Sequence, residues 1–202
     1  MLVKRLFDLI VSFLALLLLM PLMVIISGAI LISSGPPFIF SQKRSGKGRK
    51  VFTMYKFRTM VPQAEEIIEK YKHLNEADGP VFKIWEDPRY TKFGKVLAHS
   101  GFDELPQLIN LLKGQMSLVG PRPLPVLEAD KIPKKYQKRF SVLPGITSNW
   151  IVAGSHKLSF DEWMKLDLEY VKHWTIKEDI KIFLSTCLLM IKWSLDKLVY
   201  WK

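Results

Sequence analysis

The sequence predicts an α+β protein, in which an N-terminal membrane helix precedes a small antiparallel sheet element and several amphipathic or interfacial helices. Three observations support this fold class. No charged residue occurs from Leu9 to Gln42, a stretch long enough to enter a membrane. Two apolar runs then flank a glycine-rich turn at residues 45–48, which is typical of a hairpin. Further along, apolar residues recur at helical spacing between glycines and prolines.

Length and charge limit the classes of function. With 202 residues we expect two units, a membrane helix at 1–34 and a membrane-associated catalytic domain at 35–202. The formal net charge of +11 favours an anionic partner, such as lipid headgroups, a phosphorylated substrate or nucleic acid. The basic residues are dispersed and form no nucleic-acid motif, so we expect no nucleic-acid partner. The single cysteine, Cys187, cannot form an internal disulfide.

Pro21 lies in the middle of the N-terminal apolar stretch, where it removes a helix hydrogen bond. Basic residues flank both ends of the stretch, so the distribution of positive charge does not favour opposite sides of a bilayer for the two ends. A re-entrant helix that breaks at Pro21 and returns satisfies both observations. A helix that crosses the bilayer once is the alternative. The stretch is too long for the apolar core of a signal peptide.

After the turn, residues 51–55 read as the second strand of the hairpin. Lys56 and Arg58 follow it and share one face of an extended segment. They form either a solvated strand end or a phosphate-binding pair. Residues 62–76 read as a polar helix without chemistry, and residues 81–84 as a strand. Arg89 ends a turn, where a structural role and a substrate contact stay equally open.

Residues 98–123 are the most informative stretch. A short apolar helix is predicted there, with Ser100 as its N-cap and Gly114 as its C-cap. Asp103 and Glu104 fall in its first turn, where carboxylates ordinarily cap the helix. However, Arg122 follows between two prolines and offers a planar fork for phosphate oxygens. Two carboxylates beside such an arginine suggest a metal-assisted site for a phosphorylated substrate, with one carboxylate free to attack.

The C-terminal third reads mainly as helices. Residues 126–139 form a charged helical segment interrupted at Pro133, whose basic patch fits either solvent or anionic headgroups. This patch comprises Lys131, Lys134, Lys135, Lys138 and Arg139. Residues 149–154 read as a short strand or loop, and residues 160–172 as a helix capped by Ser159. A last helix at 180–201 carries tryptophan, tyrosine and lysine residues in the pattern of an interfacial anchor (Trp193, Tyr200 and Trp201 beside Lys192, Lys197 and Lys202).

The run D-E-L-P-Q-L-I-N-L-L-K-G-Q-M-S-L-V-G-P-R-P, from Asp103 to Pro123, strongly resembles the bacterial sugar transferase family. These are the monotopic polyprenyl-phosphate phosphoglycosyl transferases. The match is long and ungapped. Similar stretches are K-F-R-T-M at 56–60, N-E-A-D-G-P-V-F-K-I at 75–84, D-P-R at 87–89, P-G-I-T at 144–147 and L-D-L-E-Y-V at 166–171. The resemblance covers essentially the whole chain, although many relatives carry a further N-terminal membrane domain that we do not expect here.

The resemblance implies transfer of a sugar-1-phosphate from a UDP-sugar donor to a polyprenyl (undecaprenyl) phosphate acceptor, with release of UMP. It implies Asp103 as nucleophile, giving an aspartyl phosphosugar, and Glu104 as a Mg²⁺ ligand or as the group that handles the acceptor proton. Mg²⁺ is the expected cofactor, held by Asp103 and Glu104. Lys56, Arg58, Arg89 and Arg122 are the expected phosphate-binding or substrate-binding residues. We expect the catalytic domain on the cytosolic face of the bacterial inner membrane, in contact with membrane lipids, in surface-glycan assembly; a homo-oligomer stays open.

The chain departs from the family pattern at three positions where arginine is usual. These are Ala98, Leu143 and Ser155. An arginine at each could bind phosphate or a sugar carboxylate. Their absence favours either a different sugar or a lost activity. A catalytically weak paralogue that serves as a membrane scaffold for a glycan assembly complex is therefore the alternative function.

Overall fold

The computed structural model describes residues 2–154 and 158–199, without the side chains of Ile191 and residues 193–199. The α-helices are α1 (Leu2–Ser34), α2 (Lys92–Ser100), α3 (Leu108–Leu112), α4 (Val126–Asp130), α5 (Asn149–Val152), α6 (Phe160–His173) and α7 (Ile176–Val199). The strands are β1 (Ile39–Ser45), β2 (Val51–Phe57), β3 (Ser117–Val119), β4 (Leu124–Pro125) and β5 (Gly145–Thr147). Short 3₁₀ helices cover Lys47–Arg49, Ile68–Leu74, Phe102–Gln107 and Lys134–Ser141. The predicted mixture of helices and a small sheet is confirmed.

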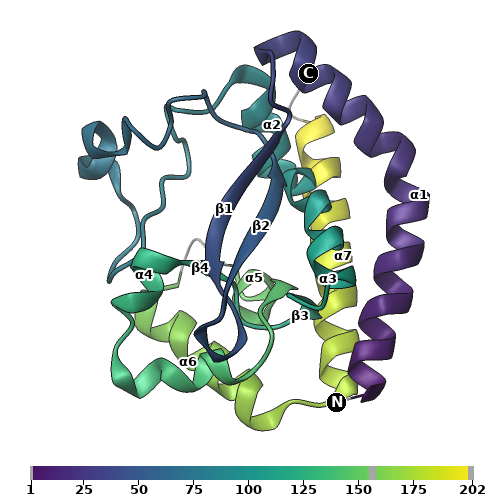
Figure 1. The fold of residues 1–202 in the computed structure, drawn as a ribbon, viewed down its shortest axis with the longest axis vertical. Coiled ribbons are helices and arrows are strands. Elements are labelled where there is room, and N and C mark those ends of the chain that lie inside the picture. The colour runs from purple at the N-terminus through teal and green to yellow at the C-terminus, as the bar shows by residue number, and fades with distance from the viewer. Residues whose placement is uncertain (1, 155–157, 200–202) are drawn as a thin grey trace.

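The β1–β2 hairpin lies in the middle of the molecule (Figure 1). The two strands pair antiparallel from Ile39 opposite Phe57 to Ser45 opposite Val51, and β4 adds to the other edge of β1. Strands β3 and β5 form a separate parallel pair. One buried hydrophobic cluster joins Phe52 and Met54 of β2 to residues of α3, α6 and α7 (Leu111, Tyr170 and Ile182). The hairpin therefore has a fixed register, which also fixes where the side chains at its end point.

Helix α1 curves along one side of the molecule, with α3 and α7 between it and the hairpin (Figure 1). Near its start, Lys4 Nζ contacts Asp179 Oδ2 at 2.6 Å, and Arg5 donates to the carbonyls of Leu111 and Leu112 at 2.7 and 3.1 Å. Those carbonyls end α3, where a cation satisfies unpaired acceptors and suits the helix dipole. The first turns of α1 are thus tied to the body of the protein.

The other end of α1 is held by Arg58. Its guanidinium donates to the carbonyls of Ser34 and Pro36 at 2.7 Å each, and also to the carbonyl of Gly35. Nearby, Ile26 and Ile30 are buried in one cluster with Phe57 and Leu97. Both ends of α1 consequently contact the same domain, while its middle presents an apolar outer face.

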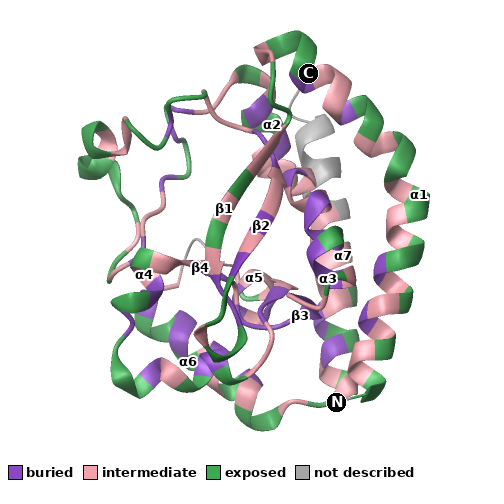
Figure 2. Cartoon of the chain, in the orientation of Figure 1, coloured by how far each residue is buried: buried purple, intermediate pink, exposed green. Residues whose placement is uncertain are grey.

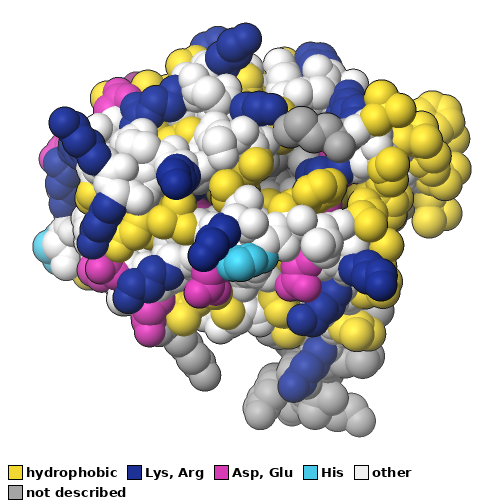
Figure 3. All heavy atoms as spheres, turned by 90° about the horizontal axis from the view of Figure 1, so that it is seen from below, with side chains coloured by type: hydrophobic (Ala, Val, Ile, Leu, Met, Phe, Trp, Pro, Cys, Tyr) yellow, Lys and Arg dark blue, Asp and Glu magenta, His cyan; other side chains and the backbone are white. Residues whose placement is uncertain are grey.

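This outer face is exposed to a degree that is unusual for a helix of a soluble protein. Leu18 is 79% exposed and Ile32 is 90% exposed. Figure 2 shows exposed residues along α1, and Figure 3 shows apolar side chains gathered on one flank of the molecule. Among the described residues, α1 is the one helix long and apolar enough to cross a membrane. The helix continues through Pro21. A break there is not shown, and re-entry stays a prediction.

Several local predictions were wrong. Ser100 is not an N-cap but the last residue of α2, and its hydroxyl donates to the Leu97 carbonyl. Gly101 then adopts a φ of 77°, which glycine tolerates without strain, and ends α2. Residues 149–154 contain the helix α5, capped by Ser148, rather than a strand. Residues 81–84 form no strand, and the predicted polar helix at 62–76 is a series of turns with a 3₁₀ segment.

The basic patch of residues 131–139 is only partly a surface feature. Its four lysines are exposed, but Arg139 is 2% exposed and binds Asp167 through two hydrogen bonds of 2.9 and 2.7 Å. A buried charge needs such a partner, and Asp167 lies too far along the chain for a sequence pattern to indicate it. The aromatic residues of the predicted interfacial anchor, Trp193, Tyr200 and Trp201, lie outside the part whose side chains are described.

Candidate active site

Asp103 and Glu104 lie on the 3₁₀ helix that follows the turn at Gly101. The backbone N–H of Glu104 donates to the Gly101 carbonyl at 3.1 Å, which starts this helix immediately after α2. The segment packs on β2, so the carboxylates face the end of the hairpin. The predicted acidic first turn exists, but it belongs to a 3₁₀ helix rather than to one continuous α-helix.

Asn110 fixes β2 relative to this acidic turn. Its amide donates to the Thr53 carbonyl at 2.7 Å, and its Oδ1 accepts from the Tyr55 backbone N–H at 3.1 Å. Asn110 is fully buried, and an unmade polar contact there would be costly. This clamp places Lys56, the next residue of β2, opposite the two carboxylates.

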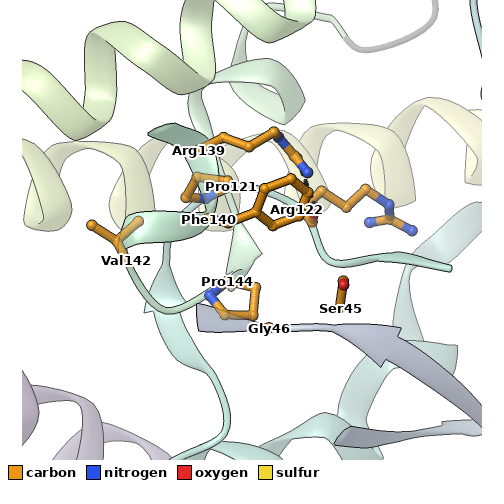
Figure 4. Close-up of a pocket in the computed structure, with 8 residues that line it drawn as sticks. All are labelled: Ser45, Gly46, Pro121, Arg122, Arg139, Phe140, Val142 and Pro144. Carbon is orange, nitrogen blue, oxygen red and sulfur yellow. Dashed lines mark hydrogen bonds between the residues drawn. The ribbon is translucent and has the colours of Figure 1, made fainter. Parts of the chain in front are cut away.

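Two glycines bring the Arg122 loop into place. A Cβ atom on Gly145 would lie 2.1 Å from the Gly120 nitrogen, so the two backbones approach too closely for any other residue. The loop is also held by Arg139, whose Nη2 donates to the Arg122 carbonyl at 2.9 Å. Arg122 and Arg139 border a small hollow beside Ser45 and Gly46 (Figure 4). The stiff loop therefore directs the Arg122 side chain toward the acidic turn.

The four side chains form one ion-pair cluster. Lys56 Nζ lies 2.6 Å from Glu104 Oε1 and 3.4 Å from Asp103 Oδ2, and Arg122 Nη2 lies 3.0 Å from Glu104 Oε1. Asp103 is 7% exposed. Among the described residues, its second oxygen, Oδ1, accepts no hydrogen bond. Each carboxylate thus uses one oxygen, and Asp103 Oδ1 and Glu104 Oε2 have no hydrogen bond from the described residues.

The environment separates the protonation behaviour of the two carboxylates. Burial raises the pKa of Asp103 to about 6, with Glu104 adding to the rise and Lys56 opposing it. Burial would also raise the pKa of Glu104, but Arg122 and Lys56 outweigh it and lower the pKa to about 2. Near neutral pH, Glu104 is a permanent anion, whereas Asp103 carries a charge that the site stabilises poorly. A poorly stabilised carboxylate is suited to attack an electrophile.

The carboxylate pair also fits part of a magnesium site. Mg²⁺ prefers carboxylate oxygens, and phosphate oxygens and water commonly complete its shell. In residues 2–154 and 158–199, no cluster of three or more metal-binding side chains occurs. Asp103 and Glu104 could hold such an ion only together with a phosphorylated ligand. Lys56 would then contact the same two carboxylates as the ion.

Arg58 and Arg89 are not part of this cluster. Arg58 binds the carbonyls at the end of α1, as described above. Arg89 is 6% exposed and pairs with Asp87 at 2.6 Å, and its Nη1 donates to the Ala64 carbonyl. The structure brings together Asp103, Glu104, Lys56 and Arg122 among the predicted site residues. Ala98 lies on α2 and Leu143 beside the Gly120 loop, while Ser155 lies outside the described residues.

Sequence reasoning missed Asn110 and Arg139, which position Lys56 and the Arg122 loop. A buried asparagine within an apolar helix is the signal that points to Asn110, because such an amide requires partners. No comparable signal exists for Arg139, since it lies in a run of exposed lysines.

These features define a class: an α+β protein with a long exposed apolar helix and a carboxylate pair held by a lysine and an arginine. The chain belongs to the bacterial sugar transferase family, which matches residues 1–193. It is 46% identical over 153 residues to the galactosyl transferase CpsE of Streptococcus agalactiae, and 34% identical over 197 residues to the undecaprenyl-phosphate galactose phosphotransferase of Salmonella typhimurium. These alignments cover 75% and 94% of this chain, but only 34% and 40% of the relatives.

A third relative is closer in length. The exopolysaccharide production protein ExoY of Sinorhizobium fredii is 32% identical over 187 residues, which cover 91% of this chain and 83% of the relative. The matching region therefore occurs both within much longer relatives and as most of a shorter one.

Proposed function

We propose that this protein transfers a sugar-1-phosphate from a UDP-sugar to undecaprenyl phosphate or a similar polyprenyl phosphate, releasing UMP. The observation that carries the proposal is the buried Asp103, whose Oδ1 is unpaired, beside Lys56 and the Glu104–Arg122 ion pair. Family membership and the name of the Salmonella relative support the same reaction class. The step would begin the assembly of a surface glycan or exopolysaccharide.

The reaction is proposed as two displacements at one phosphorus. Asp103 Oδ1 attacks the phosphorus bonded to the sugar, and the phosphoanhydride bond to UMP breaks, giving an aspartyl phosphosugar. An oxygen of the lipid phosphate then attacks the same phosphorus, and the Asp103 carboxylate leaves. Because the transfer takes place in two steps, the anionic UDP-sugar and the anionic lipid phosphate need not be bound together at the same time. Ping-pong kinetics follow from this scheme.

The other three side chains offset charge and hold position. Lys56 and Arg122 provide cationic N–H donors beside the reacting group, and Arg122 offers a planar fork for phosphate oxygens. Glu104, as a permanent anion, keeps both cations aligned. Bound Mg²⁺ would supply further neutralisation of the diphosphate.

The membrane position follows from where the substrates meet. A polyprenyl phosphate carries its reactive group at the bilayer surface, so the site must lie there as well. We propose that the apolar outer face of α1 enters the inner membrane from the cytosolic side, with both ends of the helix remaining at the domain. Exposed Leu18, Ile25 and Ile32 supply the lipid contact.

The test is UMP release by detergent-solubilised protein with undecaprenyl phosphate, Mg²⁺ and a panel of UDP-sugars. We expect release with one donor, dependent on the lipid acceptor for turnover. EDTA should abolish turnover and added Mg²⁺ should restore it. Folded protein that releases no UMP with any donor would contradict the proposal and favour the scaffold alternative.

A further inference from the structure

Three cations gather on the side of the Arg122 loop that faces Trp150. Lys83 Nζ lies 4.9 Å from the centroid of the Trp150 ring, and Arg122 Cζ lies 5.8 Å from the same centroid. Arg44 joins them from β1, where its Nη1 donates to the Pro123 carbonyl at 3.1 Å. Arg122 thus contacts Glu104 of the carboxylate pair and shares the Trp150 ring with Lys83, while Arg44 holds the loop at the next residue, Pro123.

Two of these cations have donor atoms that nothing in the described protein satisfies. Lys83 Nζ and Arg44 Nε are buried and have no hydrogen-bond partner. In residues 2–154 and 158–199, neither side chain forms a salt bridge. Buried donors are almost always paired, and a buried charge without a partner is costly. Such donors are therefore candidates for binding a ligand that the protein lacks.

The local electrostatics agree with an incomplete site. Burial lowers the pKa of Lys83 to about 8 and that of Arg44 to about 10, and in both cases the charge of Arg122 adds to the effect. Glu76 opposes the shift at Lys83 and Glu128 opposes that at Arg44, but neither forms a salt bridge with these cations among the described residues, and Glu128 accepts from the Phe82 backbone N–H at 3.3 Å. An anion bound between the three cations would stabilise their positive charges and raise the pKa values of Lys83 and Arg44.

We infer that Arg44, Lys83 and Arg122 form a second phosphate subsite, which binds a phosphate monoester next to the Asp103–Glu104 pair. The inference rests on the proposed function. In an in-line displacement the leaving group departs opposite the attacking carboxylate. The lipid phosphate must then attack the aspartyl phosphosugar from the same direction. One subsite can therefore hold the phosphate of UMP in the first step and the acceptor phosphate in the second.

A purely structural role for Lys83 makes a different prediction. If the lysine served only to pack on Trp150 through a cation–π contact, Lys83→Met would lower the melting temperature. If it is kept for a ligand, the variant loses an unpaired buried charge, and its melting temperature should stay equal or rise. The two roles are thus separated without any activity measurement.

The experiment measures the affinity of wild-type, Lys83→Met and Lys83→Arg proteins for UMP and for uridine by calorimetry, together with the KM for undecaprenyl phosphate. We expect Lys83→Met to weaken UMP binding at least tenfold without changing uridine binding, and Lys83→Arg to recover part of it. The exposed variant Lys134→Met is the control and should match the wild type.

The outcomes show whether the subsite exists and, if it does, whether it binds the phosphate of UMP or that of the lipid. Weaker UMP binding alone assigns the subsite to the nucleotide, and a higher KM for the lipid alone assigns it to the acceptor. Unchanged values for both, or a lower melting temperature of Lys83→Met with normal binding, would overturn the inference. A wild type that binds UMP but transfers no sugar phosphate would refute only the proposed function.

Discussion

Asp103→Asn should lower sugar-phosphate transfer by about a thousandfold or more, the range found when a covalent nucleophile is removed. The amide has nearly the volume of the carboxylate but is a very poor nucleophile. The site supports this choice of residue, because burial raises the pKa of Asp103 and leaves its Oδ1 unpaired, whereas Lys56 and Arg122 both hold Glu104 and lower its pKa. UMP release with a saturating donor and undecaprenyl phosphate measures the effect.

The fold of this variant should survive. The raised pKa of Asp103 means that the folded protein binds the Asp103 proton more tightly than the unfolded chain. Above a pH of about 6, its charge therefore costs stability, and a neutral amide removes that cost. Lys56 retains Glu104 as its partner. A melting temperature equal to or above that of the wild type should accompany the lost activity, and Asp130→Asn, at an exposed ion pair, should change neither.

The covalent intermediate provides a second readout. With donor and without acceptor, the wild type should gain the mass of one sugar phosphate on the peptide that contains Asp103. The same peptide from Asp103→Asn should gain nothing. An adduct on Glu104, or full turnover by Asp103→Asn, would show that the nucleophile is assigned to the wrong residue.

The same assignment sets the acid side of the pH profile. Only the deprotonated Asp103 can attack, and burial is the main cause that raises its pKa to about 6. The rate should therefore increase as the pH rises through about 6, rather than through the range near 4 of an ordinary aspartate. Single-turnover rates of UMP release between pH 4.5 and 8 test this, and a plateau already reached at pH 5 would contradict it.

A feature is predictable from the sequence when the residues that determine it are close together along the chain. Local signals worked: the hairpin turn, the Ser159 cap of α6 and the positive φ of Gly114 are each determined within a few residues. The long motif likewise placed Asp103, Glu104 and Arg122 in one neighbourhood. The predicted N-cap Ser100 was wrong, however, because Gly101, with its positive φ, ends α2 and separates it from the acidic turn.

The partners of basic residues were the least predictable feature. Lys56 and Arg58 differ by two positions and share one predicted face, yet Lys56 meets the carboxylates while Arg58 binds the end of α1. Lys83 lies in the stretch 75–84, whose sequence indicated no role for this lysine. Which acceptor each cation meets is decided by packing between elements that are distant in sequence. A sequence can therefore supply the charged groups of such a site without assigning them.

Asp179→Asn should destabilise the protein by about 3–5 kcal/mol, the cost of leaving one member of a buried ion pair without its partner. Asp179 is fully buried, and its Oδ2 accepts from Lys4 Nζ at 2.6 Å and from Trp174 Nε1 at 2.8 Å. Its Oδ1 accepts from the Tyr170 hydroxyl at 2.7 Å. The amide has nearly the same size but carries no charge, so the ammonium of Lys4 would stay partly buried with neutral acceptors only, the Val119 carbonyl and the Tyr170 hydroxyl among them.

A double-mutant cycle separates this effect from a general loss of packing. Lys4→Met with Asp179→Asn should be more stable than the sum of the two single changes predicts, because the unpaired charge is gone. Equilibrium unfolding in detergent measures all three variants, and Glu178→Gln, one residue away and partly exposed, is the control. Additive single effects would mean that the ion pair contributes nothing specific. Coupling of 1 kcal/mol or more, within the range of about 0.5–3 kcal/mol for interacting residues, would identify Asp179 as the residue that ties the start of α1 to the domain.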